Sequence, residues 1–254
     1  MSILRSISRS VGGHLNPERK RKLRFAQSLW ARLTCRRSLS KLATFYHSDK
    51  SDGHFYTQHY QRHFAPLRRR SLKILEIGVG GNEDPRDGGA SLRMWRDYFP
   101  RSTIYGIDLH DKSWHDERRI KTFKGSQDDE TFLNDVIKQI GAPDIIIDDG
   151  SHRSEHVIKT FNVLFPLLAA TGIYAVEDTQ TSYWSEYGGN ETDVNDETTM
   201  MGYFKGLIDG LNVDELRRKD YQPTYFDRHI TGMWFYHNLV FIQKGENNEG
   251  SSRY

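Results

Sequence analysis

Two stretches of the sequence run from apolar residues directly into residues that could do chemistry. IIIDDGSH (145–152) ends in two aspartates and a histidine, and IYAVEDTQTSYW (173–184) carries Glu177 and Asp178, which begin 28 residues after Asp149. If both runs are neighbouring strands, Asp149, Glu177 and Asp178 lie close together, and their like charges repel unless a cation neutralises them. An all-oxygen ligand set selects a hard ion such as Mg²⁺. The sequence therefore predicts a magnesium site.

His152 lies just beyond these acids on a predicted turn, where an imidazole is well suited to act as a general base. Asp148 need not share the task of Asp149, since successive side chains of a strand point to opposite sides. Each of these residues also has a plain structural interpretation. Strand-end aspartates mostly cap local backbone, and single histidines usually satisfy local hydrogen bonds. The functional interpretation is favoured because these acids and His152 are expected to converge beside a glycine turn, LEIGVGG (75–81).

The glycine turn closes an earlier apolar run, LEIGVGG (75–81), where glycine permits a positive φ or a close approach of backbone to a ligand. A dinucleotide fingerprint is disfavoured, because its sixth position is Glu83 instead of glycine. Glu76 in the strand, Gly78 in the turn and Asp108 at the next strand end instead resemble the nucleotide-binding half of class I S-adenosylmethionine methyltransferases. In that group the second-strand acid accepts hydrogen bonds from both ribose hydroxyls. Taken alone, Asp108 could equally cap a loop.

Two polar segments could complete this ligand site. Gln127, in KGSQDDETF (124–132), offers both a donor and an acceptor, as the edge of an adenine requires. The alternative is a helix N-cap at this point, formed by Ser126 or Asp128. The segment NEDPRDGGASL (82–92) is long for a turn and could cover the cofactor, with Ser91 at the start of the next helix positioned for the cofactor's carboxylate.

The elements that must hold these residues alternate between two patterns. Short apolar runs predict strands at 72–81, 102–110, 144–152, 172–180 and, late in the chain, one strand at 234–245. Apolar residues at a spacing of three to four predict helices over SLRMWRDYF, DETFLNDVIKQI and SEHVIKTFNVLFPLL, and over roughly residues 56–66. This order predicts an α/β fold, with a Rossmann-like doubly wound and mostly parallel sheet that binds ligands at the carboxyl ends of its strands.

Length and composition bound the class of protein. A chain of 254 residues with a single cysteine, Cys35, has neither an internal disulfide nor a multi-cysteine zinc site, which fits a reducing cytoplasm. No apolar run in the sequence approaches the roughly 18–20 residues that a membrane span needs. We expect a basic helical arm over residues 1–41, a catalytic domain over 42–245 and a flexible tail over 246–254.

The charge is unevenly distributed along the chain. Residues 1–41 carry eleven Lys or Arg against Glu18 alone, a net +10, so the rest carries −8 within the total of +2. The plain interpretation is a solvated, partly disordered arm with one helix near Arg21–Leu39. The alternatives are contact with an anionic surface or with the acidic body of a neighbouring subunit in a homo-oligomer. A transit peptide is disfavoured by Glu18 and by the lack of a cleavage signal. Specific nucleic-acid binding is disfavoured because no recognised motif accompanies the charge.

A family resemblance rests on IDDGSHRSEHVIKTFNVLFPLL followed by GIYAVEDTQTSYW. These stretches closely resemble the metal-dependent sugar O-methyltransferases of macrolide antibiotic biosynthesis, of the macrocin and mycinamicin type. Related enzymes methylate sugars of aminocoumarins and of mycobacterial polysaccharides. The resemblance covers roughly His47 to Gly245, including HSDKSDGHFYTQHY and LEIGVGG. The resemblance does not extend to the arm before about residue 41.

The resemblance implies the class I methyltransferase fold and an O-methyltransferase that uses S-adenosyl-L-methionine and Mg²⁺ on a sugar hydroxyl. It implies His152 as the catalytic base. The implied metal ligands are Asp149, Glu177 and Asp178. The implied cofactor contacts are Glu76, Gly78, Ser91, Asp108, Gln127 and Asp148.

The acceptor leaves alternatives open. Tyr183 and Trp184 follow the predicted metal ligands and could stack on a sugar ring, or they could be core aromatics. A catechol-like diol is a second acceptor class, although a phenol needs less activation and TQTSYW favours sugar. A non-catalytic binding or scaffold protein is a third interpretation, against which the clustered acids and His152 argue, since a scaffold has no use for clustered carboxylates.

Overall fold

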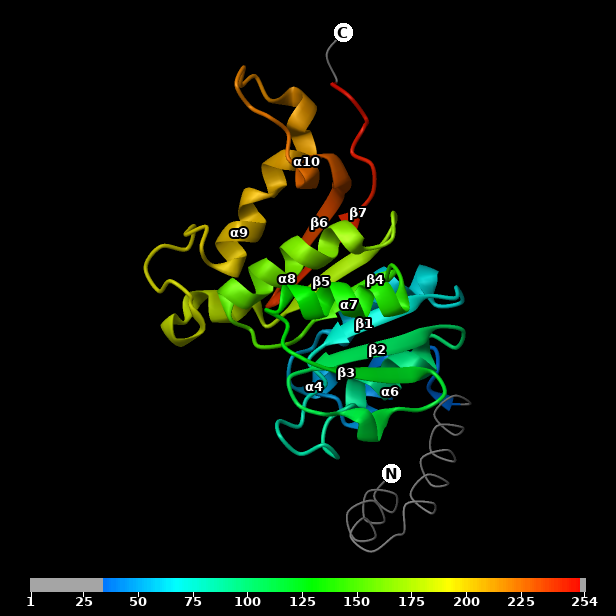
Figure 1. Ribbon diagram of the computed structural model, residues 1–254. Helices are drawn as coiled ribbons and strands as arrows, with labels where there is room; N and C mark the ends of the chain where they lie inside the picture. The colour runs from blue at the N-terminus through cyan, green and yellow to red at the C-terminus, as the bar shows by residue number, and fades with distance from the viewer. Residues whose placement is uncertain (1–33, 252–254) are drawn as a thin grey trace, which may run out of the picture.

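The computed structural model describes residues 34–251, and within this range seven strands form one sheet in the order β3-β2-β1-β4-β5-β7-β6 (Figure 1). The strands are β1 (Lys73–Ile77), β2 (Thr103–Asp108), β3 (Ile120–Lys124), β4 (Ile145–Asp148), β5 (Ile173–Glu177), β6 (Ile230–Tyr236) and β7 (Leu239–Lys244). β1 to β5 are parallel, and β7 runs antiparallel to both β5 and β6. The predicted doubly wound, mostly parallel sheet is confirmed.

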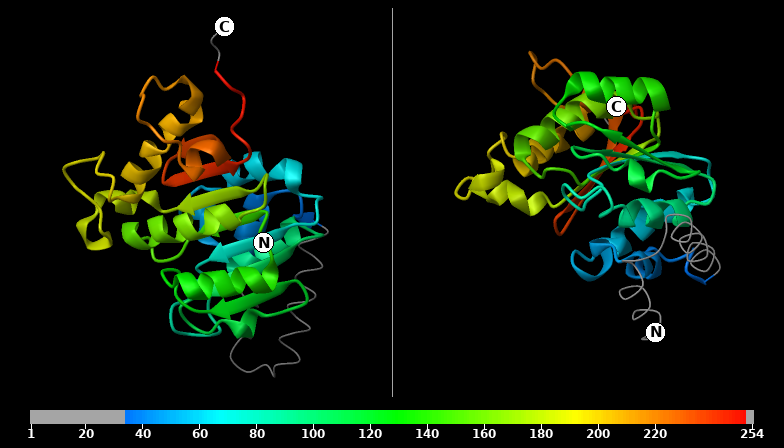
Figure 2. Two further views of the ribbon diagram at one scale, coloured as in Figure 1. Left: turned by 45° about the horizontal axis from the view of Figure 1, so that its top comes forward. Right: turned by 60° about the horizontal axis from the view of Figure 1, so that its bottom comes forward.

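Helices cover both faces of the sheet, as Figure 2 shows in its right-hand view. The α-helices are α3 (Leu39–Tyr46), α4 (Asp49–Asp52), α5 (Thr57–Phe64), α6 (Ala90–Tyr98), α7 (Glu130–Ile140), α8 (Ser154–Leu167), α9 (Met200–Gly206) and α10 (Tyr225–His229). The 3₁₀ segments are η1 (Ala65–Leu67), η2 (Ser113–His115), η3 (Thr179–Tyr183), η4 (Ser185–Tyr187) and η5 (Ile208–Glu215). One apolar cluster joins α3, α5 and α6 to the sheet, and a second joins α7, α8 and α9 to its other face. Within residues 34–251 no helix combines the length and apolarity that crossing a bilayer requires.

The strand register brings the chemistry-bearing residues to one edge. In the sheet Ile77 is level with Asp148, and Asp148 is level with Val176. The next residues in each strand direction, Gly78, Asp149 and Glu177, therefore meet at the carboxyl edge. β4 is buried along its whole length, which explains why it reads as an unbroken apolar run and not as an alternating one.

The late strand was predicted wrongly. Residues 234–245 do not form one strand, because β6 and β7 are the two arms of an antiparallel hairpin. The chain turns at His237 and Asn238, and Asn238 has φ 58°. Asparagine tolerates this left-handed conformation and is a frequent hairpin residue. The turn was hidden because the flanking residues are apolar on both sides.

The N-terminal boundary lies before residue 41. α3 is capped by Ser38, whose hydroxyl accepts a hydrogen bond from the backbone N–H of Lys41 at 3.3 Å. Leu39 and Leu42 are fully buried in the core, so the helix belongs to the domain. Residues 1–33, with most of the helix expected near Arg21–Leu39, lie outside the described residues, as do 252–254. Within the predicted tail, the side chain of Asn247 donates to backbone carbonyls of the domain.

Candidate functional site

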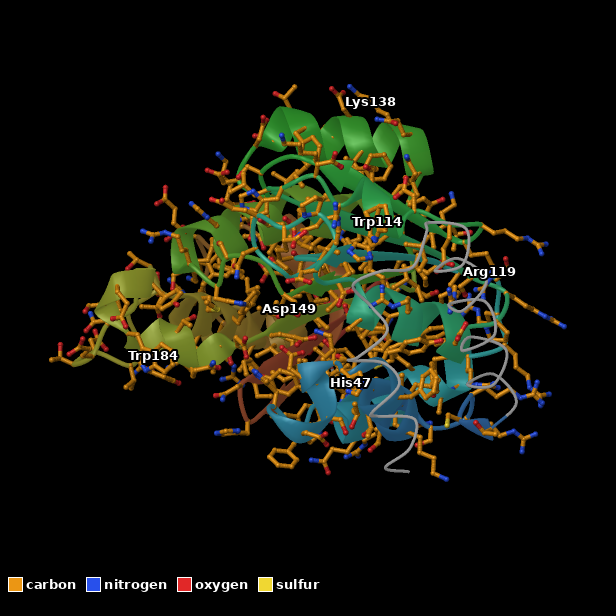
Figure 3. All side chains as sticks on the ribbon, turned by 90° about the horizontal axis from the view of Figure 1, so that it is seen from below. His47, Trp114, Arg119, Lys138, Asp149 and Trp184 are labelled. Atoms are coloured by element: carbon orange, nitrogen blue, oxygen red, sulfur yellow. The ribbon has the colours of Figure 1, made fainter. Side chains whose placement is uncertain are left out.

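The carboxyl edge of the sheet gathers three carboxylates around one buried ammonium. Lys50, on α4, places its Nζ 2.6 Å from Asp149 Oδ2, 2.7 Å from Glu177 Oε1 and 3.5 Å from Glu76 Oε1. Asp178 adjoins this group as the next residue after Glu177. In Figure 3 Asp149 lies between the helices that follow His47 and the segment that carries Trp184. Sequence reasoning missed Lys50 altogether.

The electrostatics of this cluster follow from burial and from the single ammonium. Burial by itself lowers the pKa of Lys50, but Asp149 and Glu177 outweigh it, so the pKa stands well above its ordinary value. Burial raises the pKa of Glu177 and of Asp149, although Lys50 opposes the rise in both. Burial also raises the pKa of Glu76 to about 7, against the pull of Lys50. One ammonium is thus shared among more negative charge than it can neutralise, which favours a second cation at this edge.

Further contacts come from α5, which carries Tyr60, and from the residues between α4 and α5, which include His54 and Tyr56. The hydroxyl of Tyr60 donates to Glu177 Oε1 at 2.5 Å, and that of Tyr56 donates to Asp178 Oδ1 at 2.7 Å. His54 Nδ1 lies 2.8 Å from the same oxygen of Asp178. The sequence predicted a helix over roughly residues 56–66, and HSDKSDGHFYTQHY is part of the family resemblance, but neither assigned a role to these three side chains. The one signal available was the four-residue spacing of the two tyrosines.

His152 lies beside Asp178, as predicted from its place in the sequence. Its Nε2 is 3.6 Å from Asp178 Oδ2, and it adopts a left-handed backbone with φ 56°. Burial would raise the pKa of Asp178, but the hydrogen bond from Tyr56 and the charges of His152 and His54 lower it on balance. A non-glycine residue in this conformation is costly and is often found at functional sites.

His156 is separated from the acid cluster. α8 begins only at Ser154, so His152 lies outside the helix and does not share a helix face with His156. His156 Nδ1 lies 3.0 Å from the hydroxyl of Ser151, and its Nε2 lies 3.7 Å from Asp128. Of the two imidazoles, only that of His152 faces the acids.

The predicted metal ligands divide into two groups. Ligand atoms of Asp149, His152 and Asp178 all lie within 4.8 Å of one another, a spacing that one ion can bridge. Glu177 is not part of this set. Its carboxylate accepts hydrogen bonds from Lys50 and Tyr60. The carboxylate oxygens of Asp149 and Asp178 suit a hard divalent cation such as Mg²⁺ or Mn²⁺. The donor set therefore fits a metal ion. Binding of the same ion by Glu177, as the resemblance implies, stays a prediction.

The glycine turn lies directly against the acid edge. Gly78 has φ 88°, and a Cβ at this position would lie 1.9 Å from the backbone oxygen of Asp149. Asp108 accepts hydrogen bonds from the backbone N–H of Val79 at 2.9 Å and of His110 at 2.8 Å. Asp108 thus caps the turn, as one of the two sequence interpretations expected. Each carboxylate oxygen retains a second lone pair, so the ribose contact stays a prediction.

Replacing Gly78 by alanine is expected to destabilise the fold by at least about 2 kcal/mol, because a left-handed backbone and a backbone clash both oppose a Cβ. Gly206→Ala is the control, since a Cβ added there would meet no described atom within 4 Å and alanine favours a helix. Chemical denaturation measures both. Equal stability of the two variants contradicts the assigned backbone constraint.

Two of the predicted cofactor residues are committed to protein contacts. Ser91 donates its hydroxyl to Glu76 Oε2 at 2.8 Å, so this hydroxyl is turned toward the strand. Among the described residues, the other oxygen of Glu76 is buried without a hydrogen-bond partner, although Lys50 lies 3.5 Å away.

Lys112 holds the segment 82–92 by donating to the carbonyls of Asn82 and Asp84 at 2.7 and 2.8 Å. These two hydrogen bonds hold the segment 82–92 against the loop that follows β2.

Asp148 points away from Asp149, as the alternation of strand side chains predicted. Asp148 Oδ1 accepts from Gln127 Nε2 at 3.1 Å, and burial raises its pKa to about 7. The other end of the Gln127 amide accepts from the backbone N–H of Ser151 at 2.6 Å. The α7 N-cap is Asp129, so neither of the two alternative caps, Ser126 or Asp128, is correct. Gln127 and Asp148 instead hold each other beside the turn that leads to His152.

The two aromatic residues after the acids are not core residues. Tyr183 is 39% exposed and Trp184 is 44% exposed, at the end of η3. The core alternative is therefore wrong for both. Because both rings are exposed, stacking of these rings on a sugar stays a prediction.

Comparison with known proteins gives a consistent picture, although no family model matches the chain. The mycinamicin VI 2''-O-methyltransferase of Micromonospora griseorubida is 44% identical over 214 residues, which cover 84% of this chain and 54% of the relative. The demethylmacrocin O-methyltransferase of Streptomyces fradiae is 45% identical over 198 residues, 78% of this chain and 50% of the relative. The chain spans about half the length of these relatives.

A solved structure agrees with these similarities. It is that of the MycE methyltransferase from the mycinamycin biosynthetic pathway, in complex with Mg, SAH and mycinamycin VI. The two chains superpose with a TM-score of 0.80 at 44% identity, over 84% of this chain and 55% of the other.

Proposed function

This chain has the class I methyltransferase fold and is a homologue, over 84% of its length, of a mycinamicin sugar O-methyltransferase, and from this premise we propose that it methylates a sugar hydroxyl. The proposed cofactors are S-adenosyl-L-methionine and Mg²⁺. The observation that carries the proposal is the convergence of Asp149, His152 and Asp178 within 4.8 Å, beside the glycine turn. A mechanism needs a base and an anionic ligand set at one place, and an imidazole beside two carboxylates supports this assignment.

The residues of this chain have distinct roles in the proposed reaction. When bound, S-adenosyl-L-methionine would supply the electrophilic methyl group, and Mg²⁺ would supply positive charge that stabilises a sugar oxygen as it loses its proton. His152 accepts the hydroxyl proton at Nε2, and Asp178 at 3.6 Å stabilises the resulting imidazolium. Tyr56 and His54 hold the carboxylate of Asp178 in place. Asp149, Asp178 and, as predicted from the sequence, Glu177 would hold the metal.

On the other side of the sheet edge, the proposed cofactor contacts surround the glycine turn. Gly78 lets the ligand approach backbone closely, and Asp108 is proposed to bind the ribose. Gln127 and Asp148 are proposed to lie near the adenine. These roles come from the family resemblance and from the position of each residue at the carboxyl edge.

A methyl-transfer screen tests the proposal directly. The full chain is incubated with labelled S-adenosylmethionine and diverse glycosides, with and without Mg²⁺, and with a catechol as a separate acceptor. We expect transfer to a glycoside only when Mg²⁺ is present. Transfer to the catechol but to no glycoside favours the diol methyltransferase, and failure to bind the cofactor in calorimetry favours a scaffold.

Replacing Asp178 by asparagine is expected to weaken Mg²⁺ binding by roughly 10–100-fold, because the variant loses one anionic ligand of the proposed site. Calorimetric titration of Mg²⁺ measures this loss without any substrate. Cofactor binding is expected to change little, since Asp178 faces His54 and Tyr56 and not the glycine turn. The matched control is Asp135→Asn, an exposed aspartate on α7. Equal Mg²⁺ affinity in both variants rejects Asp178 as a ligand.

We also propose a cytoplasmic enzyme, because a single cysteine cannot form an internal disulfide and fits a reducing compartment.

The acceptor is proposed to be a sugar of a glycoside, a polysaccharide or a glycosylated natural product. A homo-oligomer and a weak contact of the basic arm with an anionic surface are further proposals. They rest on the charge asymmetry of the sequence.

A further inference from the structure

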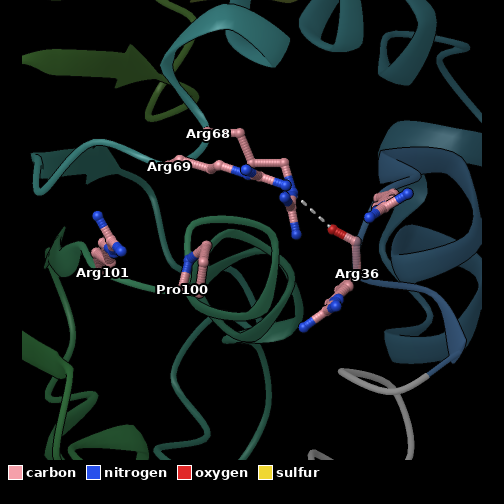
Figure 4. Close-up of a pocket in the computed structure, with 6 residues that line it drawn as sticks. Arg36, Arg68, Arg69, Pro100 and Arg101 are labelled. Atoms are coloured by element: carbon pink, nitrogen blue, oxygen red, sulfur yellow. Dashed lines mark hydrogen bonds between the residues drawn. The ribbon is translucent and has the colours of Figure 1, made fainter.

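Five arginines converge on one cavity far from the acid cluster. The cavity has a volume of about 240 Å³ and is lined by Arg36, Arg37, Arg68, Arg69, Pro100 and Arg101. Figure 4 shows Arg68 and Arg69 on a loop that crosses the view between Arg101 and Arg36. Among the described residues, no acidic side chain lines this cavity.

The cavity is at the amino edge of the sheet. The loop that carries Arg68 and Arg69 leads into the start of β1, and Arg101 directly precedes β2. Asp149 follows the end of β4, which is parallel to β1. Because the strands are parallel, the arginine cavity and the proposed catalytic site lie at opposite edges, and the arginines are not part of the proposed reaction.

The positive charge in this cavity has no internal counterpart. Within residues 34–251, none of the five arginines forms an ion pair with an aspartate or glutamate. Burial lowers the pKa of Arg68, and the charges of Arg36, Arg37 and Arg69 lower it further, although Tyr98 opposes this. A guanidinium remains charged in proteins, so five positive charges are gathered around this cavity.

The arginine at the centre of the group is held in position. Arg68 donates from Nε to the backbone oxygen of Arg36 at 3.0 Å and lies over the ring of Tyr98, 5.7 Å from its centroid. Tyr98 is itself fixed, because its hydroxyl accepts from Gln61 Nε2 at 2.9 Å. The bond to Arg36 uses only Nε, and no described residue accepts a hydrogen bond from the terminal nitrogens of Arg68. A preorganised guanidinium loses less entropy when it binds a ligand.

We propose that this arginine cavity is a binding site for a compact anion that carries phosphate groups, either a free polyphosphate or a phosphorylated lipid headgroup. The guanidinium fork matches phosphate oxygens in a bidentate geometry, which a lysine cluster does not. The cavity is smaller than the roughly 300–1,000 Å³ of sites for drug-sized ligands, so its ligand is compact. Its concave shape favours such a group over the flat acidic surface of another protein.

The test uses the full chain and a double variant, Arg69→Gln with Arg101→Gln. Both side chains are exposed, so the fold should tolerate the change. The control, Arg118→Gln with Arg217→Gln, removes the same charge from positions outside the cavity. Calorimetry with sodium pyrophosphate at constant ionic strength is the first arm. Cosedimentation with phosphatidylglycerol vesicles, against phosphatidylcholine vesicles, is the second.

We expect the wild-type chain to bind pyrophosphate or the anionic vesicles, and the cavity variant to bind at least about 10-fold more weakly, as the loss of charge-assisted hydrogen bonds implies. The control variant should bind like the wild type. Binding in the first arm identifies a free anion, and binding only in the second identifies a headgroup. Absence of binding in both arms overturns the proposal, as does equal weakening in the two variants. A change of oligomeric state in the cavity variant without phosphate binding overturns it in favour of a subunit contact.

Discussion

Replacing His152 by alanine is expected to lower turnover by roughly 10²–10⁴-fold, the usual effect of losing a general base. The physical reason is geometric. Of the two histidines near the end of β4, His152 alone faces the acids, with Nε2 3.6 Å from Asp178. A sugar hydroxyl holds its proton tightly at neutral pH, so an acceptor for that proton contributes strongly to the rate. Steady-state methyl transfer to a glycoside measures the effect.

His156→Ala is the matched control, because this imidazole contacts Ser151 and Asp128 and not the acid cluster. Its turnover is expected to stay near that of the wild type. Cofactor binding should survive in both variants. Near-normal turnover of His152→Ala, or a large loss in His156→Ala, rejects the assignment of the base.

Replacing Lys50 by methionine is expected to destabilise the metal-free protein by about 3–5 kcal/mol, the range for removing one partner of a buried ion pair. Lys50 is 1% exposed and lies 2.6 Å from Asp149 and 2.7 Å from Glu177. Methionine fills similar space but leaves these carboxylates without their cation. Denaturant unfolding in the presence of a chelator measures the loss.

Magnesium should restore part of this stability. Removal of the ammonium strengthens the attraction of the acids for a divalent ion, so Mg²⁺ should stabilise Lys50→Met more than it stabilises the wild type. Lys112→Met is the control, because this buried lysine donates to backbone carbonyls and not to carboxylates. Its stability should not respond to Mg²⁺ beyond the wild-type response. An equal Mg²⁺ effect on the two variants shows that Lys50 does not share its carboxylates with the metal site.

Much of the fold was predictable from the sequence, because the relevant signals are local. The apolar runs that end in Gly78, Asp108, Asp149 and Glu177 are confirmed as parallel strands. Parallel strands end at a common edge, so the meeting of these residues followed from the order of strands and helices alone. The opposite directions of Asp148 and Asp149 followed in the same way from the two-residue period of a strand. The hairpin of β6 and β7 was missed because its turn at Asn238 interrupts an otherwise apolar run.

Only the tertiary structure decided what surrounds the acids. Lys50 reaches Asp149 across 99 residues of sequence, and Tyr60 reaches Glu177 across 117. No local pattern marks such partners, since their contact depends on how the helices before β1 pack on the sheet. The same packing separates two adjacent residues, because Glu177 turns to Lys50 whereas Asp178 turns to Tyr56 and the histidines. The sequence determined which residues reach the edge of the sheet, and the packing of distant segments determined which charge each of them meets.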